Sequence, residues 1–381
     1  MVKKIGVRRW GDRCYHEVEE EFDDGYIVDG IFIDRADVVD TVAWDDADDA
    51  PTCRPSHRDS IQRDVCADSK GESFMRLVSF HTRRGIRFGA VYQGRIIDLV
   101  DNPRAVGVLR AKKPRSLLEF LTLGDDAIEA ALTTTDRTIR AGDSVRRLGS
   151  LHLAAPIPRP GKLLALAGNY SEHLRESGHE WASKELSTPR VFMKPGTAVT
   201  GPFDPIIFPV NGNHIDWEGE FGVVIRKTAR FVKARDAMQY VAGYTVIDDV
   251  SERSLKVDTK RTDRDGDKWF DWLNGKWFDS FAPMGPALVM KDEVPDPHKL
   301  TLQTRVNGEL KQNASTGQMI FSVAELIEWA SRWMTLEPGD VIATGTPSGV
   351  GSASGTFLKP GDVVEIEIEK IGTIRNTVER G

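Results

Sequence analysis

Alternating apolar and polar residues predict β-strands along much of this chain. Residues 361–369 alternate apolar side chains with acidic ones, which is typical of a strand with one face in solvent. We interpret its glutamates as that solvent face. Residues 86–99 contain two strand-like runs around Gln93 and Gly94, and this pattern predicts a hairpin.

Two segments carry the sequence signal of a helix N-terminus. Ser116 and Ser322 each precede a glutamate by three residues, which is the spacing of a capping box. The second signal opens a run of apolar residues at helical spacing, which predicts one buried stripe. Its members are Val323, Leu326, Ile327, Ala330, Trp333 and Met334. Because strand signals outnumber helix signals, we expect an α+β, β-rich fold.

A proline-rich segment at residues 155–161 predicts a joint between two domains. The hairpin and the first capping box lie before it, so we expect residues 75–155 to form a small N-terminal α+β domain. Residues 156–381 are then the larger domain. It is long enough to bury a core of its own.

Residues 1–74 differ from the rest in being rich in aspartate, with little amphipathic period. We predict that they are a disordered extension, or translated sequence upstream of a natural start at Met75. Short apolar runs at residues 26–28 and 31–33 keep open the alternative of a small accessory domain.

The composition excludes several classes of protein. With 381 residues, 40% hydrophobic content and a net charge of −7, the chain is expected to be a soluble globular protein without a basic surface for nucleic acid. No apolar run approaches the length that spans a membrane. Residues 1–5 lack the apolar core of a signal peptide, so we expect a cytoplasmic location. All three cysteines precede residue 74, which argues against thiol catalysis in the main body.

Three carboxylates form the most informative pattern. Glu218 and Glu220 precede an apolar run and are two residues apart, so on a strand they point to the same face. Two adjacent like charges are unfavourable unless something positive lies between them. Asp249 follows a second apolar run. Three carboxylates suit a divalent cation such as Mg²⁺ or Mn²⁺, with Ca²⁺ also possible. Spacing alone leaves open a solvated strand edge.

A series of segments resembles the motifs of the fumarylacetoacetate hydrolase superfamily, in the same order. One of them, Asp216–Glu220, is similar to the metal strand D-Y-E-G-E of that family. The others are Gly168–His173 (G-x-N-Y-x-x-H), Phe192–Pro195 (F-x-K-P), Asp249–Arg253 (D-V-S-A-R), Gly275–Asp279 with Pro283–Pro286 (G-K-x-F-D and P-x-G-P), Val306–Glu309, Gly339–Asp340 and Thr344–Gly351. Together they span residues 161 to 380.

The resemblance implies a β-rich roll or mixed sandwich for the large domain, with the active site among its loops. It also implies a metal held by Glu218, Glu220 and Asp249. The implied substrate is a small 2-oxo acid, and the implied assembly is a homodimer. Such a metal chelates the carboxylate and the 2-oxo group together, and it stabilises the enolate that forms when the neighbouring bond breaks.

His173 and Glu176 are a candidate catalytic pair. One helical turn would bring them together, and a carboxylate can orient an imidazole that deprotonates water. A surface pair is the ordinary interpretation of that spacing, but the resemblance implies that these two residues activate water. It also implies a catalytic role for Lys276, which could stabilise an oxyanion or supply a proton.

Five further residues are candidates for substrate binding. Thr346 lies in a glycine-rich loop and could bind a carboxylate through its hydroxyl and the loop amides. A phosphate loop is rejected because the segment has no G-K-[ST] ending. The other candidates are Gly345, Tyr170, Lys194 and Arg253, of which Arg253 could equally be a structural ion-pair partner.

Two departures from the family pattern bear on function. Relatives often have R-D-x-Q after the metal aspartate, whereas this chain has Lys256 in the place of the glutamine. Residues 257–273 are highly charged and carry Trp269 and Trp272. A lid over the metal and a solvated loop or oligomer contact are both consistent with that segment.

The leading hypothesis is metal-dependent hydrolysis of a carbon–carbon bond in a 2,4-dioxo acid, with release of pyruvate or a close analogue. The His173–Glu176 pair favours hydrolysis, because hydrolysis needs an activated water. The alternatives are a decarboxylase, a hydratase or an isomerase that acts on a 2-oxo acid from aromatic or sugar-acid breakdown. A non-catalytic metal-binding protein is the alternative outside enzymes.

Overall fold

The computed structural model divides the chain into two compact units, residues 1–61 with 82–85 and residues 62–81 with 86–381. Each unit is described by itself. The structure describes strands between residues 7 and 42, then residues 76–92, 95–100, 114–123, 125–140, 146–147, 151–178, 183–210 and 212–381.

In the described part of the first unit, six short strands form two three-stranded sheets. One sheet has the order β2-β1-β6, and the other has the order β3-β4-β5. The strands are β1 (Val7–Trp10), β2 (Arg13–Tyr15), β3 (Val18–Glu21), β4 (Gly25–Val28), β5 (Ile31–Asp34) and β6 (Asp40–Val42). Both apolar runs that favoured an accessory domain fall in strands. The prediction for residues 1–74 stays a prediction, because residues 43–75 lie outside the described residues.

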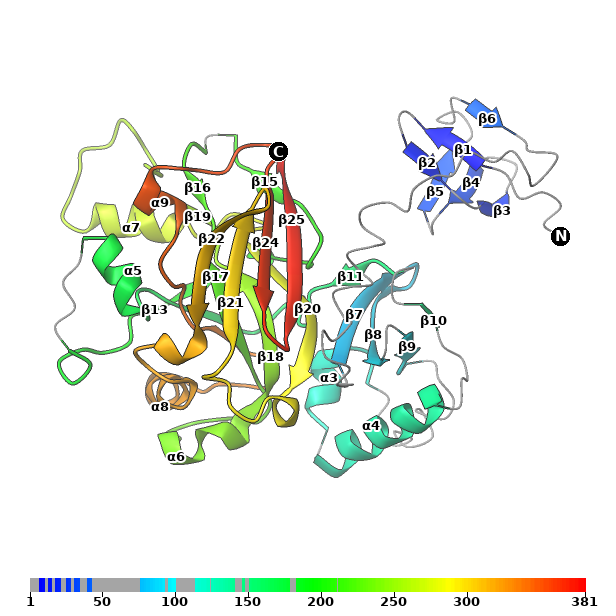
Figure 1. Cartoon of the computed structure of the whole chain (residues 1–381), viewed down its shortest axis with the longest axis horizontal. Helices are drawn as coiled ribbons and strands as arrows, with labels where there is room; N and C mark the ends of the chain where they lie inside the picture. The colour runs from blue at the N-terminus through cyan, green and yellow to red at the C-terminus, as the bar shows by residue number, and fades with distance from the viewer. Residues whose placement is uncertain are drawn as a thin grey trace. The chain divides into compact units, whose positions relative to one another are not determined.

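The second unit is built on a twelve-stranded mixed sheet with the main order β10-β9-β8-β7-β20-β18-β17-β23-β12-β13 (Figure 1). β11 pairs with β7, and β14 pairs with β20. The strands are β7 (Arg76–Thr82), β8 (Gly85–Tyr92), β9 (Arg95–Asp98), β10 (Arg146–Arg147), β11 (Leu153–Ala154), β12 (Leu163–Leu166), β13 (Val191–Lys194), β14 (Val199–Thr200), β17 (Gly219–Ile225), β18 (Val241–Asp248), β20 (Ala282–Met290) and β23 (Val341–Ala343).

A second sheet covers the centre of the first one. Its order is β15-β25-β24-β21-β22, and Figure 1 shows these strands layered against β17 and β18. Side chains from both sheets share one core, for example Phe221 and Tyr244 from the first and Ile366 from the second. The strands are β15 (Ile206–Phe208), β21 (Thr301–Val306), β22 (Glu309–Ser315), β24 (Val363–Ile368) and β25 (Gly372–Arg380). β17 and β18 are buried along their whole length, because other layers cover both of their faces.

Short helices lie around the sheets. They are α3 (Leu117–Leu121), α4 (Asp125–Arg140), α5 (Ser171–Glu176), α6 (Ala234–Ala237), α7 (Asp267–Asn274), α8 (Val323–Trp333) and α9 (Gly351–Ser354), with single 3₁₀ turns at Gly196–Ala198, Met238–Tyr240, Lys291–Glu293 and Thr316–Gln318. In the part of the chain that the structure describes, none of the helices has the length and apolar character needed to cross a membrane.

The strand and hairpin predictions are confirmed together with the α+β, β-rich class. β24 alternates buried apolar residues with more exposed glutamates. β8 and β9 pair antiparallel with Tyr92 opposite Arg95, as the hairpin pattern predicts. The residues at its turn lie outside the described residues.

The two capping boxes have different outcomes. At α8, the Ser322 hydroxyl accepts from the Glu325 amide, and the Glu325 carboxylate accepts from the Ser322 amide, so the box is complete. At α3, the Ser116 hydroxyl accepts from the Glu119 amide, but the Glu119 carboxylate accepts from the Arg115 amide at 2.8 Å. The second half of that box therefore reaches one residue further back than predicted.

The prediction that Trp333 belongs to the buried stripe of α8 is wrong. Val323, Leu326, Ile327 and Ala330 are buried, whereas Trp333 is 63% exposed. Trp333 lies at the edge of the stripe and is the last residue of the helix, and its ring lies edge-on against Trp329. Burial along a helix follows the angle around its axis, and an apolar residue at the margin need not reach the core.

The sheet continues across the expected domain boundary at residue 155. β7 pairs with β20 through Leu77 opposite Leu288, so strands from both sides of the boundary form one sheet. The division into residues 75–155 and 156–381 therefore stays a prediction.

The complete capping box at α8 gives a first testable prediction. Ser322→Ala removes the acceptor for the Glu325 amide and should lower the free energy of unfolding by about 1 kcal/mol. Chemical denaturation of the full chain measures this change. Ser187→Ala, in a segment outside helices and strands, is the control and should change the stability by less than about 0.5 kcal/mol. Equal stability of Ser322→Ala and the unmodified chain would contradict the capping role.

Candidate active site

The strand expected through residues 216–225 is interrupted, which corrects the simple picture of two glutamates on one strand. β16 (Ile215–Asp216) pairs with β19 (Ser251–Glu252), and β17 begins only at Gly219. At the break, backbone amides bind side chains. The Glu218 amide donates to Asp248 Oδ1 at 2.8 Å, and the Gly219 amide donates to Gln312 Oε1 at 3.0 Å. Side-chain acceptors thus replace strand pairing at the Glu218 amide, whereas Glu220 lies within β17 opposite Ile247.

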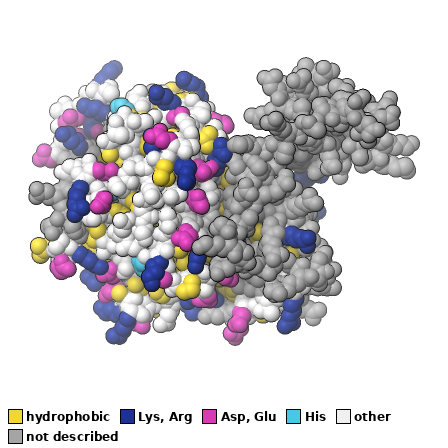
Figure 2. All heavy atoms as spheres, in the orientation of Figure 1, with side chains coloured by type: hydrophobic (Ala, Val, Ile, Leu, Met, Phe, Trp, Pro, Cys, Tyr) yellow, Lys and Arg dark blue, Asp and Glu magenta, His cyan; other side chains and the backbone are white. Residues whose placement is uncertain are grey.

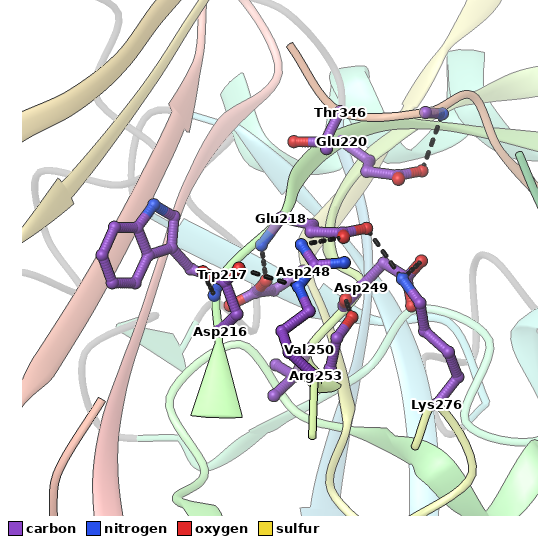
Figure 3. A network of polar contacts seen from close by, with 12 residues as sticks. Asp216, Trp217, Glu218, Glu220, Asp248, Asp249, Val250, Arg253, Lys276 and Thr346 are labelled. Carbon is purple, nitrogen blue, oxygen red and sulfur yellow. Dashed lines mark hydrogen bonds and ion pairs between the residues drawn. The ribbon is translucent and has the colours of Figure 1, made fainter. Parts of the chain in front are cut away.

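Three carboxylates meet at this break. Glu218, Glu220 and Asp249 are all buried, and each offers an oxygen that lies within 4.8 Å of the other two (Figure 3). Asp249 directly follows β18, which is the neighbour of β17 in the sheet. We call these three residues the carboxylate cluster. They are the three metal ligands expected from the sequence.

Three cationic side chains surround the carboxylate cluster. Lys276 Nζ donates to Glu218 Oε2 at 2.8 Å and to Asp249 Oδ2 at 2.7 Å. Lys194 Nζ donates to Asp249 Oδ1 at 2.5 Å and also to two backbone carbonyls. Arg253 pairs with Glu218 and donates from Nε to Asp216 Oδ2 at 2.8 Å, as Figure 3 shows.

The pKa values follow from burial and from these neighbours. Burial raises the pKa of Glu220, and the nearby charges of Asp249 and Glu218 raise it further, so it lies well above its usual value. Burial also disfavours the charged form of Glu218, but Arg253, Lys276 and His173 outweigh that effect and lower its pKa. Burial alone would lower the pKa of Lys276, and the carboxylates of Asp249 and Glu218 raise it above its usual value.

The residues present fit a divalent cation. Glu220 accepts from the Gly345 amide with Oε2, while its buried Oε1 has no hydrogen-bond partner among the described residues. With Asp216, Asp248 and Glu252, the acidic groups at the break exceed the three cations by three charges when all are ionised. An acceptor oxygen without a donor and an excess of negative charge are what an oxygen-liganded divalent cation would satisfy.

His173 and Glu176 form the expected pair on α5. His173 Nδ1 lies 2.9 Å from Glu176 Oε1, and the side chains are 13% and 20% exposed. Glu176 Oε2 accepts from the Gly349 amide at 2.9 Å. His173 is close enough to the carboxylate cluster to lower the pKa of Glu218. The pair therefore lies beside the cluster and is partly open to solvent.

Thr346 and Gly345 lie in the loop that follows β23, and both contact the break. The Thr346 hydroxyl donates to the Gly219 carbonyl at 3.0 Å and accepts from Gln312 Nε2 at 2.8 Å. The single proton of this hydroxyl is thus already donated to a backbone carbonyl of the protein. Gly345 provides the amide bound by Glu220. Substrate binding by these two residues stays a prediction.

Tyr170 is the remaining substrate-binding candidate. It immediately precedes α5, it is buried, and its hydroxyl has no hydrogen-bond partner in the described parts of the chain. Burial raises the pKa of Tyr170, and the charge of Glu220 adds to that shift. The hydroxyl is therefore a neutral donor close to the carboxylate cluster.

Sequence reasoning missed three residues that shape the site. Asp216 accepts from the amides of Trp217, Gly351 and Ser352 in addition to Arg253, and its place at the start of the metal motif was an available signal. Asp248 holds the Glu218 amide, and burial raises its pKa to about 7. Gln312 comes from β22, far away in the sequence, so no local pattern marked it.

Residues 257–273 are held by a cluster of charges. Arg261 donates to both oxygens of Asp271, at 2.8 and 2.5 Å, and α7 forms at the end of this segment. Trp272 of α7 packs edge-on against Phe192, and Lys276 Nζ lies 5.3 Å from the centre of the Trp272 ring. Lys256 pairs with Asp263 at 3.5 Å. A lid role for this segment stays a prediction.

The comparison with protein families decides the identity at the family level. The model described as the C-terminal domain of fumarylacetoacetate hydrolase matches residues 162–379. The chain belongs to the fumarylacetoacetate hydrolase family. Among its relatives, bovine "Oxaloacetate tautomerase FAHD2B, mitochondrial" is 44% identical over 267 residues, which are 70% of this chain and 80% of that protein. The resemblance noted in the sequence is thereby confirmed.

Solved structures confirm the fumarylacetoacetate hydrolase fold. Fumarylacetoacetate hydrolase from Exiguobacterium antarcticum has a TM-score of 0.65 and 31% identity, over 81% of this chain and all of that one. Maleylpyruvate hydrolase from Sphingobium sp. SYK-6, in complex with manganese(II) and pyruvate, has a TM-score of 0.63 and 30% identity, over 80% of this chain and 99% of that one. The manganese in that family member and the buried carboxylate cluster here both point to divalent-cation binding.

The expected cytoplasmic location is wrong by the same comparison, because the bovine and human relatives are named mitochondrial. The expectation rested on the lack of an apolar signal-peptide core at residues 1–5. That test detects secretion, whereas mitochondrial targeting segments are amphipathic and carry no such core.

Surface charge is mixed on the face that Figure 2 displays. Over the residues it colours, Lys and Arg side chains are interspersed with Asp and Glu. The homodimer expected from the resemblance stays a prediction.

The fit to a cation gives a second prediction. Glu220→Gln should weaken Mn²⁺ binding at least about tenfold, because a charged ligand becomes a neutral amide. Isothermal titration of the full chain measures this. The same change should raise the melting temperature of the metal-free protein. The pKa of Glu220 is raised in the folded state, so above pH ~4.3 this carboxyl group makes folding less favourable, and a neutral Gln avoids that cost.

Glu252→Gln is the matched control. Glu252 is also buried and lies at the same break, but its carboxylate accepts from the amides of Asn213, His214 and Ser254 instead of joining the carboxylate cluster. The Glu252→Gln variant should leave Mn²⁺ affinity unchanged and lower the melting temperature. Equal loss of Mn²⁺ affinity in both variants would show that Glu220 is not a ligand.

Proposed function

We propose that this chain is a divalent-metal-dependent enzyme that interconverts the keto and enol forms of oxaloacetate or a closely similar 2-oxo acid. The observation that carries the proposal is the carboxylate cluster, with its unpartnered Glu220 oxygen, beside the His173–Glu176 pair. The 44% identity to a relative named oxaloacetate tautomerase supports this choice of reaction.

Tautomerisation needs two things from the protein. A base must remove a proton from the carbon beside the 2-oxo group, and the negative charge that develops on the oxygen must be stabilised. A cation held by Glu218, Glu220 and Asp249 would supply that charge stabilisation when bound, with Mg²⁺ and Mn²⁺ as the candidates. No bond between carbon atoms breaks, and no water is consumed.

His173 is the proposed base. With Glu176 accepting at Nδ1, that nitrogen carries the proton and Nε2 is left free to take one. The proton removed from carbon goes to His173 Nε2, and the same group returns it to the oxygen, so the reaction is balanced without a further reactant. Glu176 stabilises the imidazolium between these two steps.

Lys276 is the proposed electrostatic partner. Its pKa is raised by Asp249 and Glu218, so its ammonium stays charged beside the reacting oxygen at neutral pH. Phe192 and Trp272 lie within 5.2 and 5.3 Å of Nζ and further favour the cation. Tyr170, Lys194, Arg253, Gly345 and Thr346 are proposed to shape the substrate site.

Hydrolysis of a carbon–carbon bond in a 2,4-dioxo acid is the second candidate. The solved structure named maleylpyruvate hydrolase, in complex with manganese(II) and pyruvate, supports it. The same His173–Glu176 pair would then act on water instead of on carbon. The two reactions share the enolate and differ in their products.

Metal dependence and product analysis test the proposal. The purified chain should speed the decay of enol absorbance of oxaloacetate, EDTA should abolish the effect, and Mg²⁺ or Mn²⁺ should restore it. The product should remain the four-carbon acid. Pyruvate and CO₂ would identify a decarboxylase, and two carbon fragments from an acylpyruvate would identify the hydrolase. No turnover with either metal would refute enzymatic activity on this class.

The role of His173 gives a separate prediction. His173→Ala should lower kcat by at least about a hundredfold, the usual contribution of a general base, and should leave Mn²⁺ affinity unchanged. His152→Ala is the control, since that half-exposed histidine pairs with Asp204 away from the carboxylate cluster, and it should retain full turnover. Unchanged turnover in His173→Ala would exclude it as the base.

A further inference from the structure

Trp217 joins the carboxylate cluster to the loop that follows β23. It lies between Asp216 and Glu218, is 1% exposed, and donates from its indole Nε1 to the Gly349 carbonyl at 3.0 Å. Figure 3 shows the indole directed away from the carboxylates of Glu218 and Asp249. The indole therefore lies apart from the carboxylate cluster, and the residue to which it donates is Gly349.

Gly349 connects the indole to the catalytic pair. Its amide donates to Glu176 Oε2 at 2.9 Å, and Glu176 Oε1 lies 2.9 Å from His173 Nδ1. A continuous hydrogen-bonded series thus runs from Trp217 through Gly349 and Glu176 to the imidazole. We call it the Trp217–His173 series.

The backbone at Gly349 allows little adjustment. Its φ is +99°, and a Cβ at this position would lie 2.0 Å from the Lys311 carbonyl oxygen. Only glycine fits there, and strand β22 blocks movement in that direction. The loop is therefore a firm support whose carbonyl is held by Trp217 and whose amide holds Glu176.

The helix that carries the pair needs such a support. α5 has six residues, all described, and none of them is buried. A helix of this length has little stability of its own, so its position depends on contacts with the rest of the protein. The hydrogen bond from Gly349 to Glu176 is thus a major constraint on where α5 lies.

We infer that Trp217 is a positioning residue that sets the catalytic pair against the carboxylate cluster. Trp217 is the neighbour of Glu218 in the sequence, so the residue that positions the base is bonded directly to a candidate metal ligand. The cation and the base are then held at a set separation although they come from segments far apart in the sequence. The part concerning turnover rests on the proposed function.

Hydrogen exchange tests the inference without any activity. Trp217→Phe removes the indole donor, so amides in residues 171–178 should exchange at least about tenfold faster in the full chain. Phe221→Leu is the matched control, since it also shrinks a buried aromatic side chain close by in the sequence without touching Gly349. It should leave exchange in that segment unchanged. Equal protection of residues 171–178 in Trp217→Phe and the unmodified chain would overturn the inference.

A double variant separates positioning from general loosening. Glu176→Ala breaks the Trp217–His173 series at its other end. If both changes act on one tether, Trp217→Phe in the Glu176→Ala background should cause no further increase in exchange. Additive increases would show that Trp217 acts by another route and would overturn the inference. If Trp217→Phe fails to fold, replacing the indole by benzothiophene at residue 217 deletes the donor and keeps the shape.

Turnover supplies an independent reading. Trp217→Phe should lower kcat at least about tenfold with KM and Mn²⁺ affinity unchanged, because the base is misplaced while the carboxylate cluster is intact. A parallel loss of Mn²⁺ affinity would indicate a general structural role and contradict positioning. If the unmodified chain shows no turnover, the proposed function fails, and the exchange experiment still decides the role of Trp217.

Discussion

Burying several carboxylates next to one another is the constraint to which the rest of this structure responds. Glu218, Glu220 and Asp249 lose their water where β17 begins and β18 ends, and like charges at this distance repel strongly in a medium of low dielectric. Lys194 and Lys276 offset part of that cost through direct hydrogen bonds, and Arg253 does so through an ion pair with Glu218. Such buried pairs contribute little net stability because of desolvation. Their arrangement is better explained by a cation site than by folding.

The surrounding architecture keeps the carboxylates close. β17 and β18 are central strands that are buried on both faces, so the carboxylates at the start of β17 and directly after β18 cannot relax into solvent. Gly219 allows the second sheet to come near, since a Cβ there would lie 2.4 Å from Thr304 Oγ1. Gln312 can then bind the Gly219 amide and Thr346 together. The site is thus formed where two sheets and one loop meet, and its supporting residues come from distant strands.

Much of the local structure could be predicted from the sequence because it depends on neighbours along the chain. The Ser322–Glu325 cap, the β8–β9 hairpin and the alternation in β24 all have partners within a few residues or follow from period two. The break at Trp217 has a non-local cause, because the Glu218 and Gly219 amides donate to Asp248 and Gln312, which lie far away in the sequence. Trp333 is exposed because it lies at the margin of the buried stripe of α8.

The sequence by itself determined the residue types of the candidate site and their order, since carboxylates two apart and a histidine three residues before a glutamate are local patterns. The tertiary structure alone decided that these segments converge, that Lys276 is buried between Glu218 and Asp249, and that Gly349 holds Glu176. The physical reason is the distance along the sequence over which each interaction acts. Periodicity and capping act within a few residues, whereas burial and charge pairing depend on which strands the fold places side by side.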